Sequence, residues 1–342
     1  MSTIRDVARE AGVSVSTVSL AFNSPERVSP ETRERIARAA ASVDYQSPDP
    51  VAQTLSSGRS QLIGMVQADI SNAFFGKLLR EVELHAHARG YLVIVSDSNA
   101  EHEREEKILR HMSSMRVAGM IVSPCGLNEA ETAHLHDLKT PFILFDQKHE
   151  GLSCDFVGTD NQLASATLTD HLIQLGHRRI GFLGGVEGLY TARERERGFV
   201  DRMQASGLEI DSELMVDARY TYEASYAQSR RLLTMQRPPT ALLACSNVMS
   251  LAALQAIRDL GLECPGDISL TGIDDVPWMH MISPQITVVV QPVEAMAQTT
   301  ARLILERIEQ RQNGSNTAAE FTDNIFPPVL KIGDSSASLN ET

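Results

Sequence analysis

The chain has 342 residues, of which 42% are hydrophobic and 22% are charged. It is longer than one ordinary domain, and its composition is typical of a folded globular protein rather than a disordered or fibrous one. No apolar run approaches the roughly 20 residues of a membrane-spanning helix, and the N-terminus lacks the apolar core of a signal peptide. The sequence therefore predicts a cytoplasmic protein of two or three compact units with no membrane partner.

Charge is distributed unevenly along the chain. The formal net charge of −13 by itself argues against nucleic-acid binding, because phosphates attract cations. Residues 1–60, however, contain seven arginines and seven acidic residues, so the whole acidic excess lies in the rest of the chain. A neutral N-terminal segment on an acidic body is compatible with DNA binding through a small head.

Motifs of metal and enzyme sites are absent. The cysteines are widely spaced, without a CxxC pair or a zinc-like His/Cys cluster, and are expected to be free thiols: Cys125, Cys154, Cys245 and Cys264. Phosphate-binding, nucleophile-elbow and zinc-protease motifs are also missing. We expect no metal, no cofactor, no catalytic residues and no enzymatic activity.

Residues 4–45 predict helices with short connections. Apolar residues at helical spacing follow Thr3, a candidate N-cap, and Gly12 ends this first helix. Ser14 can cap a second helix, and Ser29 precedes a proline that opens a third. A helix, a glycine turn and a second helix with small polar residues at its start have the geometry that places a helix in a major groove. Spacing alone fits a small helical capping domain equally well.

Strands and helices alternate from residue 61. Short apolar runs, typical of strands buried on both faces, lie at 62–66, 91–95, 119–123, 142–146, 179–185, 241–246 and 268–274. The pattern restarts near residue 179, which predicts two doubly wound α/β lobes. We assign residues 61–160 and 275–290 to the first lobe, and 161–274 and 291–335 to the second.

The head resembles the LacI/GalR family of transcription regulators. The family pattern T-x-x-D-V-A-x-x-A-G-V-S-x-x-T-V-S-x-x-x-N is matched by Thr3, Asp6, Val7, Ala8, Ala11, Gly12, Val13, Ser14, Thr17, Val18, Ser19 and Asn23. The resemblance continues in the body at residues 69–75, 157–177, 191–199, 246–247, 272–275 and 286–292. Within the family, the chain looks somewhat like the maltose-regulon repressors. It departs from the family at Gly333, where the C-terminal strand usually has arginine.

The resemblance implies an architecture and a function. Residues 1–46 would be an all-α helix-turn-helix head, 47–60 a hinge helix, and 61–342 an α/β two-lobed sensor resembling type I periplasmic binding proteins. The implied protein is a DNA-binding transcription regulator, expected to be a repressor, controlled by a small-molecule effector such as a sugar. A homodimer on a palindromic operator is preferred over a tetramer, because no heptad-bearing extension follows residue 335.

The resemblance also implies which residues contact DNA. Val15, Ser16 and Leu20 would face base edges, and Leu20 stands where many members have arginine or histidine. The expected phosphate contacts are Thr3, Ser14, Thr17, Asn23, Ser29 and Thr32. In the hinge the implied residues are Ala52, Gln53 and Leu55, of which Leu55 would wedge into the minor groove. One extra residue before Pro48 shifts the hinge relative to the family pattern.

Polar residues at strand ends predict an effector cleft. Asp146 and Asp274 each end an apolar strand, and Asn247 follows another. A single strand-end aspartate is more often a helix cap, but these positions and Arg195 match the family's effector contacts and favour a ligand site between the lobes. Thr191 belongs to the same set, and flat walls would come from Phe75, Tyr220 and Trp278.

Two other classes of protein have the same lobes. A transport or chemoreceptor binding protein would have a signal peptide and no helix-turn-helix, which is the reverse of this sequence. An α/β enzyme acting on sugars or nucleotides would need a nucleophile or base constellation, and none is found.

Overall fold

The computed structural model describes residues 2–23, 25–45, 60–125, 129–149, 151–313 and 320–339. The hinge positions Ala52, Gln53 and Leu55 lie outside the described residues. The chain divides into two compact units, Met1–Gln61 and Leu62–Thr342. Each unit is described by itself below.

The first unit is helical, as predicted. Its described elements are α1 (Ile4–Ala11), α2 (Val15–Asn23), a short 3₁₀ helix (Pro25–Arg27) and α3 (Pro30–Ser42). Gly12 adopts a left-handed φ of 62° where α1 ends, a conformation that glycine enters without steric cost. The Ser14 hydroxyl accepts a hydrogen bond from the Thr17 backbone N–H at 3.1 Å. Ser29 caps α3 in the same way, with Pro30 as its first residue.

Apolar residues of α1, α2 and α3 form one small core. Val7, Val18 and Ile36 are almost fully buried at its centre. The rings of Phe22 and Tyr45 make an edge contact at 5.8 Å between centroids. The core fixes which face of α2 points inward, and therefore which face remains available to a partner.

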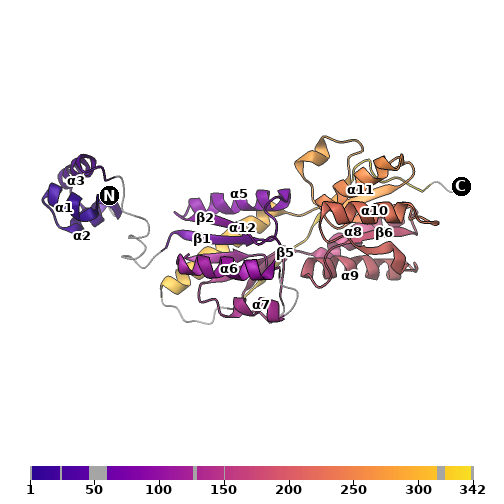
Figure 1. Cartoon of the computed structure of the whole chain (residues 1–342), viewed down its shortest axis with the longest axis horizontal. Coiled ribbons are helices and arrows are strands. Elements are labelled where there is room, and N and C mark those ends of the chain that lie inside the picture. Colours follow the sequence, from indigo (N-terminus) through magenta and orange to yellow (C-terminus); the bar gives the residue numbers. More distant parts are fainter. Residues whose placement is uncertain are drawn as a thin grey trace. The chain divides into compact units, whose positions relative to one another are not determined.

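The second unit contains two α/β lobes, with helices on both faces of each sheet (Figure 1). In the described residues the sheet of the first lobe has the order β11-β5-β4-β3-β1-β2. Its strands are β1 (Leu62–Gln67), β2 (Leu92–Asp97), β3 (Gly119–Val122), β4 (Phe142–Phe145), β5 (Asp155–Thr159) and β11 (Asp323–Phe326). Its helices are α5 (Ala73–His87), α6 (His102–Ser114), α7 (Glu129–His136) and α12 (Val293–Gln312).

The second lobe repeats this architecture with the order β12-β10-β9-β8-β6-β7. Its strands are β6 (Ile180–Gly184), β7 (Met215–Asp217), β8 (Ala241–Ala244), β9 (Ser269–Ile273), β10 (Thr287–Val290) and β12 (Val329–Lys331). Its helices are α8 (Asn161–Gln174), α9 (Tyr190–Ala205), α10 (Tyr222–Leu233) and α11 (Asn247–Asp259). The inner strands β6, β8, β9 and β10 are parallel and almost completely buried, because helices cover both faces of the sheet, whereas the edge strands β7 and β12 are partly exposed.

The predicted division of the C-terminal residues between the lobes is wrong. Residues 275–290 belong to the second lobe, since β10 pairs in parallel with β9 and places Val289 opposite Ile273. Most of 291–335 belongs to the first lobe, because α12 packs beside α5 and β11 pairs with β5. Apolar periodicity shows that a segment is buried but does not show in which sheet, and here the strand ladder decides.

The C-terminal segment is tied back onto the second lobe. The Leu270 N–H donates to the carbonyl of Ser335 at 2.7 Å, and the Thr287 N–H donates to the Ser335 hydroxyl at 2.9 Å. A side chain at Gly333 would bring its Cβ within 2.4 Å of the Gln285 carbonyl oxygen. Glycine at this position therefore permits close backbone packing, where the family usually has arginine.

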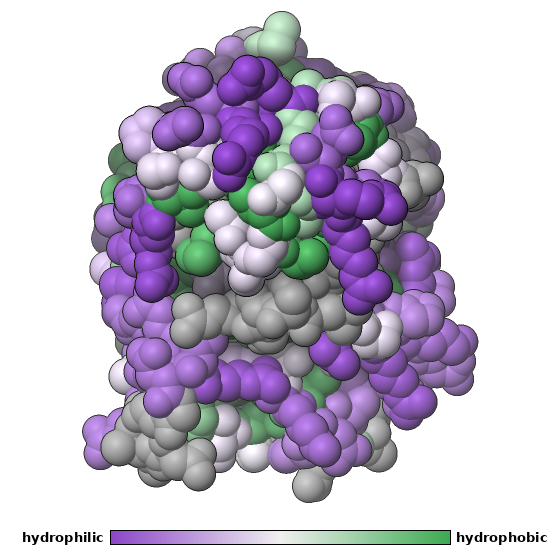
Figure 2. All heavy atoms as spheres, turned by 90° about the vertical axis from the view of Figure 1, so that its left-hand side faces the viewer, coloured by the Kyte–Doolittle hydropathy of each residue, from purple (hydrophilic) through white to green (hydrophobic). Residues whose placement is uncertain are grey.

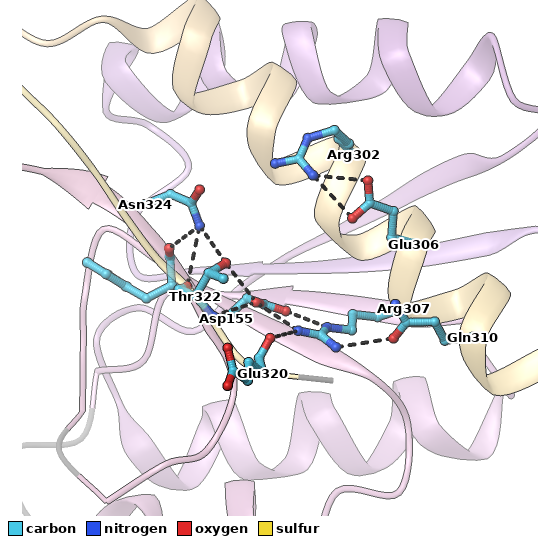
Figure 3. A network of polar contacts seen from close by, with 9 residues as sticks. Asp155, Arg302, Glu306, Arg307, Gln310, Glu320, Thr322 and Asn324 are labelled. Carbon is cyan, nitrogen blue, oxygen red and sulfur yellow. Dashed lines mark hydrogen bonds and ion pairs between the residues drawn. The ribbon is translucent and has the colours of Figure 1, made fainter. Parts of the chain in front are cut away.

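A buried ion pair holds the first lobe together where β5 begins (Figure 3). Arg307 on α12 donates to both carboxylate oxygens of Asp155, at 2.6 and 3.0 Å. Thr322, just before β11, donates its N–H and its hydroxyl to the same carboxylate, at 2.9 and 3.1 Å. Arg307 also donates to the Glu320 carbonyl oxygen. We call these four residues the clasp, because they join β5, α12 and the approach to β11.

No helix among the described residues is long and apolar enough to cross a membrane. The face drawn in Figure 2 is largely hydrophilic, and the hydrophobic residues on it form small separated areas.

Candidate functional site

The exposed face of α2 carries the predicted base contacts. The side chains of Val15 and Leu20 are 42% and 36% exposed, and Ser16 is exposed between them, whereas Val18 is buried. The structure therefore leaves the three predicted residues accessible on one helix. The described part of α2 has no charged side chain, so hydrogen bonding from this helix is limited to hydroxyl and amide groups.

The predicted phosphate contacts lie mainly at helix starts. The hydroxyls of Ser14, Ser16 and Thr17 are linked, with Ser14 2.7 Å from each of the others. At the start of α3 the Ser29 hydroxyl donates to Thr32 at 2.9 Å. Thr3, at the start of α1, is exposed. Backbone N–H groups and hydroxyls at helix N-termini are well placed to bind phosphate oxygens. The side chain of Asn23 lies outside the described atoms.

Charged side chains meet at the carboxyl ends of strands in the second unit. Asp146 follows β4 of the first lobe, Asp274 follows β9 of the second, and Arg195 lies on α9; all three are more than 90% buried. Both aspartates adopt a left-handed backbone, with φ of 63° and 80°. Arg195 interacts electrostatically with both carboxylates, which come from different lobes. Buried charges of this kind, two of them on strained backbone, are costly and indicate a functional site.

Amides and carbonyls hold these charges in place. Arg195 donates to the Asn161 side chain at 2.7 Å and to the Cys245 carbonyl oxygen at 2.6 Å. Asp274 accepts from Asn247 at 3.0 Å and from Gln291 at 2.6 Å. Thr159 links the two sets, because its carbonyl accepts from Asn161 and its hydroxyl donates to Gln291. The predicted residues Arg195, Asp274 and Asn247 therefore belong to one bonded group, whose other partners were not predicted from the sequence.

The Asp146 carboxyl has an unusual pKa. Burial raises its pKa to about 6, the positive charge of Arg195 opposes this rise, and the negative charge of Asp274 adds to it. In the described part of the chain its carboxylate accepts a single hydrogen bond, from the Gln147 amide at 3.3 Å. Asp146 therefore retains capacity to accept hydrogen bonds from a ligand.

Gln147 joins the two lobes at the start of α9. The N-cap residue of this helix, Leu189, offers no side-chain cap. Instead the Gln147 side-chain oxygen accepts from the Thr191 N–H at 3.3 Å, and the Gln147 amide donates to the Thr191 hydroxyl at 2.8 Å. Gln147 thereby caps α9 from the other lobe, one turn before Arg195.

Tyr220 completes this group from the second lobe. Its hydroxyl lies 3.2 Å from the Thr191 hydroxyl, and its ring centroid lies 6.0 Å from the guanidinium carbon of Arg195. Burial raises the pKa of Tyr220 to about 12, so the phenol stays protonated. The ring occupies the space above Gly185, where a Cβ would lie 2.1 Å from it. Glycine at 185 is therefore required for this position of the aromatic wall.

Phe75 and Trp278 do not join the bonded group. Phe75 makes an edge contact with Phe74 at 5.1 Å, and the partly buried Trp278 packs against the core of the second lobe. A cavity of about 320 Å³ opens beside Asp274, between α5 and residues 274–277. Phe74 and Gln291 line it, rather than the predicted Phe75 and Trp278.

Two buried polar side chains of the first lobe were not among the predicted site residues. Gln67 ends β1 and Ser123 follows β3, and each is 1% exposed. In the described structure the Gln67 amide and the Ser123 hydroxyl have no hydrogen-bond partner. Gln67 follows Met65 by two residues and Ser123 follows Ile121 by two, so both lie on the sheet face that packs against α5 and α12. Val66 pairs with Val122, which places Gln67 and Ser123 side by side at the carboxyl edge of the sheet. Unpaired buried polar groups are costly unless a ligand or water satisfies them. A polar residue closing an apolar run is the signal that would have found Gln67.

The described residues contain no cluster of three His, Cys, Asp or Glu side chains that could hold a metal ion. Cys125, Cys154, Cys245 and Cys264 are free thiols.

Comparison with known proteins gives matches over both units. Residues 3–48 match the model of bacterial regulatory proteins of the lacI family, and residues 169–336 match a periplasmic binding protein-like domain. The repressor PurR of Haemophilus influenzae (strain PittEE) is 30% identical over 315 residues, covering 92% of this chain and 93% of the relative. The repressor CytR of Escherichia coli (strain K12) is 28% identical over 316 residues, covering 92% of each.

Solved structures show the same fold. The lac repressor dimer bound to operator and the anti-inducer ONPF superposes with a TM-score of 0.84 at 24% identity, covering 98% of this chain and 99% of the other. The transcriptional regulator CelR in complex with cellobiose gives a TM-score of 0.72 at 26% identity, covering 98% and 100%.

A helix-turn-helix head joined to a two-lobed binding domain defines a ligand-responsive transcription regulator. The chain belongs to the lacI family of bacterial regulatory proteins. It is a DNA-binding regulator whose larger domain takes an effector.

Proposed function

We propose that the protein is a homodimeric repressor that binds a palindromic operator and responds to a sugar or related metabolite held between its lobes. The observation that carries the proposal is the buried group of Asp146, Arg195 and Asp274, contributed by both lobes. The unpaired Gln67 and Ser123 lie at the carboxyl ends of β1 and β3, in the same sheet as β4, which Asp146 follows. A ligand that pairs these groups favours one arrangement of the lobes and thereby changes operator affinity.

The chemistry of this group favours a neutral, hydroxyl-rich ligand. The group contains two carboxyl groups and one guanidinium that interact electrostatically, so it has no excess positive charge to bind an anion. Carboxylates accept hydrogen bonds from hydroxyl groups, amides both donate and accept, and the Tyr220 ring offers an apolar face. Thr191 orients Tyr220, and Asn247 orients Asp274.

DNA binding is assigned to the exposed face of α2 and to the helix starts around it. Val15, Ser16 and Leu20 would contact bases, while Thr3, Ser14, Thr17, Asn23, Ser29 and Thr32 would contact phosphates. The hinge residues Ala52, Gln53 and Leu55 would enter the minor groove when two copies meet on DNA.

A second copy is proposed because one reading helix covers only one half-site. Exposed apolar side chains in the first lobe support an interface between copies. Leu84 on α5 is 52% exposed, and Leu92 on the edge strand β2 is 57% exposed. A regulator of this kind acts in the cytoplasm, where its operator lies, and we propose no catalytic role, because its relatives are transcription regulators.

The test is a thermal-shift screen of sugars, polyols and purines on the full-length chain, followed by operator selection from random duplexes. A ligand that binds the native state raises the unfolding temperature by mass action. We expect a hit among hydroxyl-rich compounds and enrichment of an inverted repeat, with operator affinity altered by the same compound. Selection of a non-repeated sequence, or a ligand without effect on operator affinity, would contradict the proposal.

A further inference from the structure

The exposed face of α2 has an unusual chemical pattern. At about 100° per residue, Val15, Ser19, Ser16 and Leu20 occupy one arc of about 140°. Val15 and Leu20 lie at its two margins, and the serines lie between them. In the described part of the head these two are the large hydrophobic side chains exposed to solvent. The opposite side is fixed by Val18, which is fully buried.

The positive charges of the head lie on other elements. Residues 12–23 contain no charged side chain. Exposed arginines flank this segment on α1, the 3₁₀ helix and α3: Arg5, Arg9, Arg27, Arg33, Arg35 and Arg38. The same elements also carry acidic residues, so the head has no net positive charge, but all its charged side chains lie outside α2. Arginines beside an uncharged helix fit a partner whose negative groups lie on either side of a neutral, partly apolar surface. The major groove of DNA between its phosphate backbones is such a surface.

The hydroxyl groups on the arc are a weak source of base discrimination. Ser16 lies 2.7 Å from the Ser14 hydroxyl, which also accepts from the Thr17 N–H. A serine hydroxyl both donates and accepts, so it can bond to any base edge. Selective contact with guanine is typically made by arginine or lysine, and α2 has neither.

We propose that Val15 and Leu20 recognise the 5-methyl groups of thymine, so that methyl contacts carry the operator specificity of α2. The methyl group is the apolar feature of the major-groove floor, and branched aliphatic side chains complement it. This inference rests on the proposed function, because it takes α2 as the helix that enters the groove.

The experiment uses the full-length protein and the half-site obtained by selection from random duplexes. Each thymine is then replaced in turn by uracil, which removes the methyl group and keeps every hydrogen-bonding atom. Burial of one methyl group corresponds to a change of about three- to fivefold in affinity. We expect this loss of affinity at two positions in each half-site. Where cytosine is tolerated at such a position, 5-methylcytosine should bind more tightly than cytosine, because it restores the methyl group.

Two alanine variants assign the contacts. Leu20→Ala should abolish the uracil effect at one position and keep it at the other, and Val15→Ala should do the reverse. Both side chains are exposed, so the fold should tolerate either change. Leu20→Arg should shift preference toward guanine at the Leu20 position. Leu251→Ala, an exposed leucine of α11 outside both the head and the proposed interface between copies, serves as a control that keeps both uracil effects.

A selected half-site that shows no uracil effect would overturn the inference while leaving the proposed function intact. The same holds if the uracil effects persist in both alanine variants. Failure of the wild-type protein to enrich any sequence would refute the proposed function itself, and this inference with it.

Discussion

The second unit contains two buried arginine and aspartate groups that differ in how fully they are bonded. In the clasp, Asp155 receives hydrogen bonds from Arg307 and from the backbone and side chain of Thr322 (Figure 3). In the ligand site, Asp146 and Arg195 attract each other, but Arg195 donates to Asn161 and to a carbonyl oxygen instead of to the carboxylate. An aspartate whose carboxylate is fully hydrogen-bonded, such as Asp155, stabilises the fold. An aspartate with unused hydrogen-bonding capacity, such as Asp146, can still bind a ligand.

The carboxyl pKa values follow this difference. Burial alone would raise the pKa of Asp155, but hydrogen bonds from Arg307 and Thr322 outweigh burial and hold the pKa below its usual value. At Asp146 burial prevails over Arg195, and the pKa rises to about 6. A buried carboxyl with a raised pKa indicates a group that still lacks hydrogen-bond donors. Such a group is a better guide to a binding site than the number of charges around it.

The largest effect is expected from Arg307→Ala, which leaves the Asp155 carboxylate buried without its cation. The Asp155 side chain is 1% exposed, so the free energy of unfolding should fall by about 3–5 kcal/mol. Arg302→Ala is the matched control on the same helix, because its pair with Glu306 is about half exposed, and it should cost about 0.5 kcal/mol or less. Urea unfolding of the full chain measures both. Equal losses in the two variants would contradict the structural role of the clasp.

The second effect concerns the ligand site. Arg195→Ala should weaken effector binding by roughly 1–3 kcal/mol, or about 5- to 150-fold, because it removes a buried donor that orients the ligand group. Operator binding without effector should persist. Arg193→Ala, two residues away on α9 with a half-exposed side chain, is the control. Titration with the compound found by thermal shift, followed by the fluorescence of Trp278, provides the affinities. Wild-type affinity in Arg195→Ala would remove Arg195 from the site.

A smaller effect is expected when the contact between the lobes is removed. Gln147→Ala deletes the cap of α9, which is worth about 0.5–2 kcal/mol. Hydrogen exchange should become faster at the backbone N–H of Thr191, and effector affinity should fall by a few-fold. Lys148→Ala changes the neighbouring residue, which pairs with Asp323, and should leave both properties unchanged. Unaltered exchange at Thr191 would show that Gln147 does not cap this helix in solution.

The pH dependence should distinguish the two groups. Asp146 has a folded pKa of about 6, above the ordinary value of 3.8, so the folded chain binds this proton more tightly than the unfolded chain. Its contribution to stability is full below pH 3.8 and is lost as the pH rises through 6. Between pH 7 and 5 wild type should therefore gain about 1 kcal/mol relative to Asp146→Asn. Asp155 has the opposite sign, and its contribution is lost only as the pH falls below 3.8. A constant difference between wild type and Asp146→Asn over this range would contradict the raised pKa.

Part of the molecule could be predicted because the signals are local. The glycine turn at Gly12 and the caps at Ser14 and Ser29 act through bonds to residues at most four positions away in the chain. Apolar runs such as 62–66 and 142–146 likewise predict buried strands from the physical cost of exposing them. The helices of the head and the alternation of strands and helices followed from these signals. The DNA-binding role of the head and the ligand-binding role of the strand-end aspartates came from the resemblance to the family.

The tertiary structure decided what depends on distant partners. The sheet that β10 joins, the Gln147 cap on α9, and the unpaired state of Gln67 and Ser123 are set by residues far away in the chain. The contrast between Asp155 and Asp146 also depends on distant residues. In the sequence the two look alike, because Asp155 begins a strand and Asp146 ends one. Saturation of a carboxylate depends on which donors the fold brings within about 3 Å. A periodic pattern specifies burial, but it carries no information about those donors.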